Sequence, residues 1–198
     1  MSVQTTYGYA NGKGIAGGIY DMYHYPVETR FNEEENGVLR FGVGVVRGSI
    51  AGSNVVLPSE DSEAADFEGV VVNGFSNQQD LEGKVFIMNN QNIGVMRKGK
   101  IWVRVAEDAA PAYGAPAFMV AEGDEAGFFT EDEEGGIAIN ARFIGAANNG
   151  LAPIELFDGV AGGGAEPYTL PTASADTLGG VKVGTGLNIS ADGKLNVG

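Results

Sequence analysis

The chain of 198 residues contains no cysteine and only one histidine, His24. The lack of cysteine excludes disulfides, thiolate metal sites and cysteine nucleophiles, so stability must come from non-covalent packing or oligomerisation. The sequence contains no G-x-S-x-G or similar motif that would supply a nucleophile for His24, so a catalytic triad is a poor interpretation. The Gly-Lys-Ser/Thr tripeptide of a phosphate-binding P-loop is also missing. We therefore expect neither an enzyme nor a bound cofactor.

Positive charge is scarce as well: 12 Lys and Arg stand against 26 Asp and Glu, for a formal net charge of −14. A surface this acidic repels phosphate backbones, so we expect no direct contact with nucleic acid. No apolar run approaches the roughly 18 residues of a membrane span, and the N-terminus lacks the basic and apolar regions of a signal peptide. We expect a soluble protein made in the cytoplasm, without membrane contact.

Glycine is abundant instead, with 32 residues, roughly twice the usual share of about 7%. Short β-branched runs lie between turn residues, whereas the best helical windows, Ser62–Asp66 and Asn77–Leu81, allow little more than one turn. The pattern predicts an all-β chain, with an antiparallel β-sandwich or barrel as its body. Strands are expected over Gly37–Val46, Asn54–Leu57, Phe67–Val72, Lys84–Met88, Ile101–Val105, Ala117–Val120, Ala126–Phe129, Ile137–Phe143 and Ala152–Leu156.

Composition divides the chain into four parts. Residues 1–30 lack an apolar period over most of their length and are expected to form an extended N-terminal arm. The β body is expected over residues 31–159, and a Gly-rich linker, which contains VAGGGAEP, over residues 160–169. Residues 170–198 form a small C-terminal module.

The C-terminal module reads as a β-hairpin with one apolar face. Asp192-Gly193 is a typical type I′ turn between two alternating runs. So small a hairpin buries too little apolar area to be stable alone, so its face needs either the rest of the chain or identical copies. The second arrangement gives a homo-oligomer, for which the resemblance described below implies a trimer, with a dimer as the alternative. The candidate self-association residues are Val181, Val183, Leu187, Ile189, Leu195 and Val197.

Charged and aromatic clusters supply the remaining candidates. The acidic runs read as solvated loops, and a calcium site at Asp124, Glu125 and residues 131–134 lacks the usual ligand spacing. The tyrosines near His24 favour contact with another protein. Five basic residues could dock an acidic partner surface or could simply discourage unwanted strand pairing, and both interpretations stand. These five are Arg97, Lys98, Lys100, Arg104 and Arg142.

Several segments of the body, taken in their order along the chain, resemble the structural cement family of tailed phages, whose members decorate icosahedral capsids. The segments are Phe41–Gly48, Val55–Pro58, Phe67–Val72, Lys98–Val103, Ala110–Phe118, Gly127–Phe129, Ala141–Ala147 and Gly150–Leu156. The C-terminal motif LPTASADTLGGVKVGTGLNISADGKL is similar to segments of phage head-fibre and tail-fibre proteins, which are commonly trimeric. Each motif alone is weak, but their order gives the resemblance its weight.

The resemblance implies a virion structural protein on the outer surface of the expanded capsid, where it bridges and stabilises subunits of the major capsid protein. The alternative is a fibre-type protein that binds a host receptor or glycan, and this rests on the C-terminal module alone. A glycan-degrading enzyme has only scattered carboxylates to support it.

Overall fold

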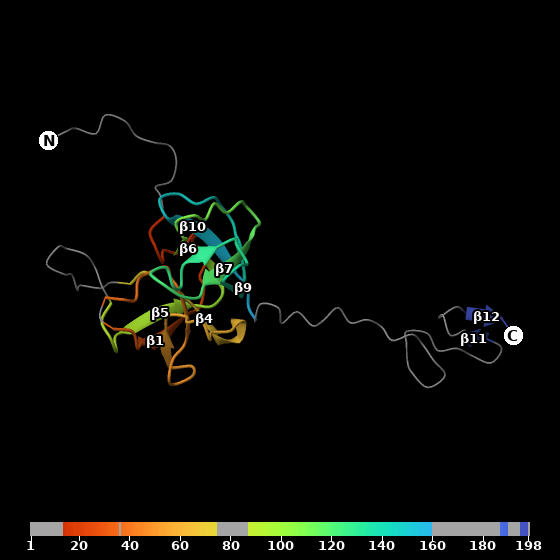
Figure 1. The fold of residues 1–198 in the computed structure, drawn as a ribbon, viewed down its shortest axis with the longest axis horizontal. Helices are drawn as coiled ribbons and strands as arrows, with labels where there is room; N and C mark the ends of the chain where they lie inside the picture. The colour runs from red at the N-terminus through yellow and green to blue at the C-terminus, as the bar shows by residue number, and fades with distance from the viewer. Residues whose placement is uncertain (1–13, 36, 75–86, 160–186, 190–194, 198) are drawn as a thin grey trace, which may run out of the picture. The chain divides into compact units, whose positions relative to one another are not determined.

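The structure is a computed structural model that describes residues 14–35, 37–74, 87–159, 187–189 and 195–197. The chain divides into two compact units, Met1–Gly162 and Gly163–Gly198. The first unit is the body, which is built of two five-stranded sheets (Figure 1). Among the described residues no helix has the length and apolarity that a membrane crossing would require.

The first sheet is a closed barrel with the strand order β1-β3-β2-β4-β5. β1 closes it by pairing antiparallel with β5 and parallel with β3, and all its other pairs are antiparallel. Its strands are β1 (Val27–Asn32), β2 (Gly44–Arg47), β3 (Asn54–Val56), β4 (Phe67–Val71) and β5 (Asn92–Met96).

The second sheet is wholly antiparallel, with the order β6-β10-β9-β7-β8. Its strands are β6 (Gly99–Arg104), β7 (Pro116–Val120), β8 (Phe129–Thr130), β9 (Gly136–Phe143) and β10 (Leu151–Leu156). Strand alternation turns one face of this sheet toward the barrel and leaves the other face outward.

Adjacent apolar residues in the barrel strands serve two different cores. Val45 and Val71 belong to the core inside the barrel, whereas their neighbours Val46 and Val70 belong to the core shared with the second sheet. Successive side chains of a strand point to opposite faces, so a strand that is buried on both sides needs a continuous apolar run. The adjacent valines Val45–Val46 of β2 and Val70–Val71 of β4 are explained in this way.

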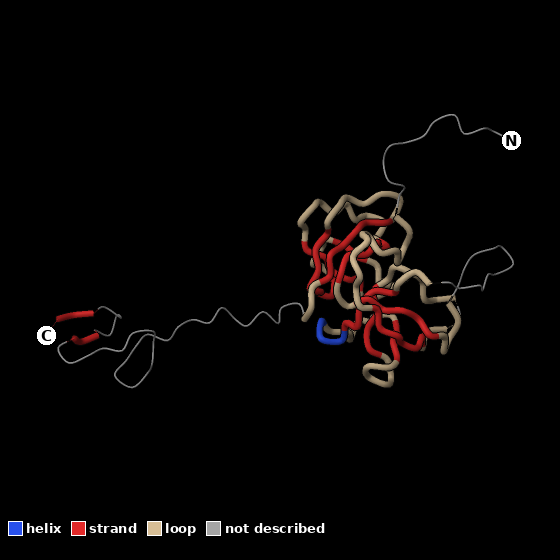
Figure 2. The backbone as a smooth tube through the Cα atoms, turned by 180° about the vertical axis from the view of Figure 1, so that it is seen from behind, coloured by secondary structure: helices blue, strands red, loops and turns tan. Residues whose placement is uncertain are grey.

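The all-β prediction is confirmed, with one 3-10 turn, η1 (Ala64–Asp66), in the described body (Figure 2). The strand expected over Gly37–Val46 is wrong for residues 37–43, because Gly37 and Gly42 have φ values of 81° and 77° and form turns there. The strand expected at Ala126–Phe129 begins only at Phe129. Residues 87–88 are not in a strand, and the rest of the expected strand Lys84–Met88 lies outside the described residues.

Two boundaries in the structure can be compared with the four parts expected from the sequence. β1 crosses residue 30, the expected end of the N-terminal arm, and belongs to the barrel. The division between Gly162 and Gly163 falls within the expected linker. In the second unit, β11 (Leu187–Ile189) pairs antiparallel with β12 (Leu195–Val197), as the hairpin prediction requires. Val181, Val183 and the expected turn lie outside the described residues.

Candidate functional site

One edge of β6 pairs with β10. The opposite edge, called the β6 edge below, has no neighbouring strand in the sheet and is covered instead by segments from distant parts of the chain. Trp102 N donates to the Gly18 carbonyl at 2.8 Å, and Tyr20 N donates to the Lys100 carbonyl at 3.0 Å. Further along, Arg104 N donates to the Gly42 carbonyl at 2.8 Å. The edge is therefore paired without a regular neighbouring strand, which protects it from unwanted association.

Alternation along β6 buries Ile101 and Val103 and turns three side chains outward, those of Lys100, Trp102 and Arg104. The register places Glu155 of β10 opposite Lys100, and Arg142 of β9 opposite Glu155. Three of the five predicted docking residues, Lys100, Arg104 and Arg142, thus lie on the outer face of one sheet. Arg97 and Lys98 lie instead at the exposed turn between β5 and β6.

Most of these basic residues are neutralised within the body. Arg142 donates to Glu155 Oε2 from Nε at 2.9 Å and from Nη2 at 2.7 Å, and its guanidinium lies over the Phe157 ring. Lys100 Nζ lies 3.5 Å from Asp21 Oδ2. Such pairing occupies the groups that would otherwise contact a partner.

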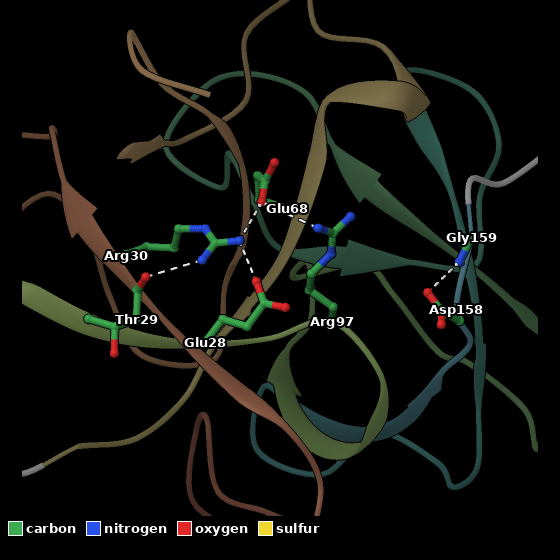
Figure 3. Close-up of polar contacts among 7 residues, drawn as sticks. All are labelled: Glu28, Thr29, Arg30, Glu68, Arg97, Asp158 and Gly159. Atoms are coloured by element: carbon green, nitrogen blue, oxygen red, sulfur yellow. Dashed lines mark hydrogen bonds and ion pairs between the residues drawn. The ribbon is translucent and has the colours of Figure 1, made fainter. Parts of the chain in front are cut away.

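Arg97 is drawn into a cluster on the barrel surface that Figure 3 shows in close-up. The buried Arg30 guanidinium lies between Glu28 and Glu68, with Nη2 at 3.2 Å from Glu68 Oε2, and Arg97 lies 3.8 Å from the same oxygen. Two positive and two negative charges balance each other there. The sequence-level pattern did not reveal this cluster, because its members are brought together by the pairing of β1 with β5 and of β5 with β4.

Arg104 is the exception among the outward cations. Its Nε donates to the Phe41 carbonyl at 3.0 Å, and no carboxylate among the described residues pairs with it. Burial, and then the positive charge of Arg40, lower the pKa of Arg104 from its ordinary value. Lys98 is also free of ion pairs in the described body, but it is exposed at a turn.

Residues 14–25, called the strap below, run along the β6 edge and present apolar side chains to solvent. Met22 is fully exposed, Tyr23 is 71% exposed and Ile15 is 60% exposed. The Tyr20 ring lies 5.6 Å from that of Trp102, which anchors the strap on the outer face of β6. The sequence indicated a protein-contacting role for these tyrosines but gave no sign of Ile15 or Met22.

Asp21 fixes the end of the strap. Its carboxylate accepts hydrogen bonds from Tyr23 N and from the Tyr25 hydroxyl, both at 3.1 Å. Burial opposes the charged form, but these hydrogen bonds and Lys100 outweigh it, so the pKa of Asp21 is lowered. His24 beside them is exposed.

Several acidic side chains hold loops in place. Glu33 accepts from Ser49 N at 2.7 Å, from the Ser49 hydroxyl and from Asn54, which lowers its pKa. Glu125 and Glu131, both in the range considered for calcium, each accept a backbone N–H, from Glu107 at 3.0 Å and Ala110 at 2.9 Å. Within the described ranges no three acidic or histidine side chains gather in a way that could hold a metal ion.

An all-β body with a covered sheet edge and an exposed apolar strap has the features of a protein that contacts other proteins. Comparison with known families makes this specific: residues 3–157 match the phage family described as "Structural cement protein (E217 gp24/Pam3 gp6)". The chain belongs to this family, which makes it a phage structural protein of the virion capsid. The resemblance of the body to the structural cement family is thus confirmed.

A solved structure supports the fold. A chain from the structure entitled "The capsid of Myoviridae Phage XM1" is similar, with a TM-score of 0.61 at 15% sequence identity. The similarity covers 80% of the present chain and 99% of that chain. No curated protein matches.

Proposed function

We propose that the chain decorates the outer surface of the expanded phage capsid and bridges neighbouring subunits of the major capsid protein. The exposed strap carries this proposal. Met22, Tyr23 and Ile15 form an apolar and aromatic set on an otherwise highly acidic chain. Aromatic residues and Met are enriched at protein interfaces, and large apolar side chains left exposed along one segment are typical of a surface that contacts another protein.

The proposed mechanism is stabilisation by binding and requires no reaction. A protein that binds only the expanded shell favours that state by mass action. A copy that contacts two subunits also holds them together, since both contacts must break before the subunits separate. The five basic residues predicted to dock on the capsid, Arg97, Lys98, Lys100, Arg104 and Arg142, enter this proposal unequally, because four of them make contacts within the body.

The C-terminal module has a separate proposed role in self-association, with a trimer favoured over a dimer. It lies beyond the residues that match the family and forms its own compact unit. The register pairs Leu187 with Val197 and Ile189 with Leu195, which accounts for four of the six candidate residues. If the module is instead only displayed outward, it contributes nothing to the oligomeric state.

The decisive experiment is co-sedimentation of the purified full-length chain with expanded and unexpanded capsids of its own phage. Saturable retention on expanded capsids is expected, and it should be about tenfold weaker for Tyr23→Ala, the loss typical of one interface hot spot. Tyr113→Ala is the matched control, since Tyr113 is 74% exposed but lies in the loop between β6 and β7. Retention by host envelope without capsid binding would contradict the proposal and favour the fibre-type alternative.

The same preparation tests the C-terminal module. Removing residues 170–198 should reduce the molar mass measured by light scattering to that of the monomer, while capsid binding by the body persists at lower avidity. An unchanged mass would show that the module does not hold copies together.

A further inference from the structure

The basic residues of the described body divide into paired and unpaired ones. Arg30, Arg47, Arg97, Lys100 and Arg142 form ion pairs with carboxylates of the body. Arg40, Lys98 and Arg104 form none with described residues, although acidic residues outnumber basic ones by 26 to 12 in the whole chain. Where carboxylates are this plentiful, an unpaired and partly buried guanidinium calls for a physical reason.

Arg40 directly precedes the segment Phe41–Gly42, which contacts Arg104 at the junction of the two sheets, and it is near enough for its positive charge to act on Arg104. Arg104 leaves β6 on its outer face and donates from Nε to the carbonyl of Phe41, the residue that follows Arg40, at 3.0 Å. Its terminal amino groups make no hydrogen bond within the described residues, and they are not among the buried unsatisfied atoms there. They remain within reach of an external acceptor.

The backbone beneath this pair is held firmly. Gly42 N donates to the Val71 carbonyl of the barrel at 2.9 Å, and the Gly42 carbonyl accepts from Arg104 N at 2.8 Å. A Cβ on Gly42 would lie 2.7 Å from Gly17 N, so the segment is packed backbone against backbone. A receptor built on fixed backbone loses little conformational entropy when it binds its ligand.

Electrostatics makes the arrangement costly without a ligand. Arg104 is half-buried beside another cation, and a guanidinium that is partly removed from water is best stabilised by a carboxylate, often through two parallel hydrogen bonds. Asp124 lines the same surface hollow as Arg40, of about 270 Å³, but no ion pair joins the two. The compensating charge is therefore absent from the described body.

We propose that Arg40 and Arg104 together form a receptor for one carboxylate side chain of a neighbouring capsid subunit. The identity of the partner rests on the proposed function, whereas the carboxylate chemistry rests on the unpaired guanidinium pair. A carboxylate is favoured over nucleic-acid phosphate because the net charge of −14 repels a polyanion, while a single acidic side chain meets only the local positive field.

The test uses full-length Arg40→Gln and Arg104→Gln variants in the co-sedimentation assay with expanded capsids, across a range of salt concentrations. Arg104→Gln should weaken binding by tenfold or more, as expected when one partner of a desolvated charge pair is removed, and Arg40→Gln by a few-fold. Arg104→Lys should restore only part of the affinity, because it keeps the charge but loses the bidentate geometry. Arg47→Gln is the matched control, since it removes an exposed guanidinium that is paired with Asp66 and is not among the candidate docking residues, and it should bind like the wild type.

The outcomes separate this inference from the proposed function. If the wild type binds and all variants bind equally well, the receptor is wrong and the capsid role stands. If the wild type itself is not retained, the proposed function fails. Arg40 is exposed, so its substitution leaves the fold intact and keeps the test valid even if Arg104→Gln unfolds. Binding of the wild type to duplex DNA that both variants lose would also overturn the inference, because the ligand would then be a phosphate.

Discussion

The barrel and the second sheet complete their hydrogen bonding in different ways. The barrel closes by regular pairing of β1 with β5 over five consecutive residue pairs, from Val27–Met96 to Phe31–Asn92. The second sheet leaves one edge of β6 without a strand, and that edge is completed by the strap, by Gly42 and by a single bridge from Val105 to Phe129. Regular pairing makes a self-contained element, whereas irregular pairing depends on segments that also belong to other parts of the body.

Charge follows the same division. On the barrel surface Arg30, Arg47 and Arg97 are all paired with carboxylates. The unpaired, partly buried Arg104 lies at the β6 edge, and so does the exposed apolar strap. Lys100 and Arg142 of the second sheet are paired as well, so among the cations of the described strands Arg104 at the β6 edge is the one that remains available to a partner.

The largest loss of stability is expected from Gly17→Ala, a substitution where the strap contacts both the barrel and the second sheet. Gly17 has a φ of 74°, and a Cβ there would lie 2.6 Å from Asn73 N and 2.7 Å from the Val71 carbonyl oxygen. Left-handed backbone costs alanine about 1–2 kcal/mol, and overlap with backbone atoms that cannot move adds a similar amount. We expect a loss of about 3 kcal/mol in the free energy of unfolding, measured by denaturant titration.

Gly52→Ala provides the matched control for that substitution. Gly52 has nearly the same φ, 73°, but a Cβ there would meet nothing within 4 Å. The loss in free energy of unfolding for Gly52→Ala should stay at about 1–2 kcal/mol, the cost of the backbone conformation alone. Equal losses for the two variants would mean that close packing at Gly17 contributes nothing.

A smaller effect is expected from Arg30→Ala, which breaks the balanced cluster of the barrel. Glu68 is largely buried, but Arg97 stays beside it, and Glu28 is half exposed. The loss should therefore be about 2 kcal/mol, below the usual cost of breaking a buried ion pair. Arg47→Ala, which removes an exposed partner of Asp66, should cost less than about 1 kcal/mol. If Arg30→Ala is as mild as Arg47→Ala, the cluster is not a stabilising element.

The same cluster explains why β1 escaped prediction from the sequence. Its burial pattern is inverted: Arg30 and Asn32 are buried, whereas Val27 and Phe31 are 42% and 43% exposed. Asn32 is satisfied by hydrogen bonds with Met88 O and Glu34 N, both at 2.9 Å. Apolar periodicity finds strands whose buried face is apolar, such as β6, β9 and β10, and it fails where buried side chains are polar and paired.

The candidate site, like the fold, could be predicted only in part from the sequence. Alternation along β6 was visible in the sequence, and it places Lys100 and Arg104 on one face. Their partners were not visible, because Asp21 and Phe41 are brought to β6 by long-range pairing. Arg40 lies in a segment that was predicted to be a strand, and no local pattern links it to Arg104. Charges that are close in sequence predicted a patch, but pairing with distant acids decided which charges stay free.

The smallest predicted effect is local and tests whether the strap opens independently of the barrel. The pKa of Asp21 lies below its ordinary value, so its contribution to holding the strap is complete above the ordinary aspartate range near 4 and is lost as the pH falls through the lowered value. Hydrogen exchange, corrected for the intrinsic rate at each pH, should then rise a few-fold at Gly17 and Tyr20 but not at Val71 of the barrel.

Asp21→Asn should produce the same faster exchange of the strap already at neutral pH, because the amide cannot pair with Lys100. Asp158→Asn is the control, since among the described residues the Asp158 carboxylate accepts a hydrogen bond from Gly159 N alone, at 3.1 Å, and the substitution should leave the strap unchanged. A parallel rise at Val71 in Asp21→Asn would mean that strap and barrel open together. The irregularly paired edge would then be as cooperative as the closed barrel, and the distinction between the two would apply to their construction but not to their dynamics.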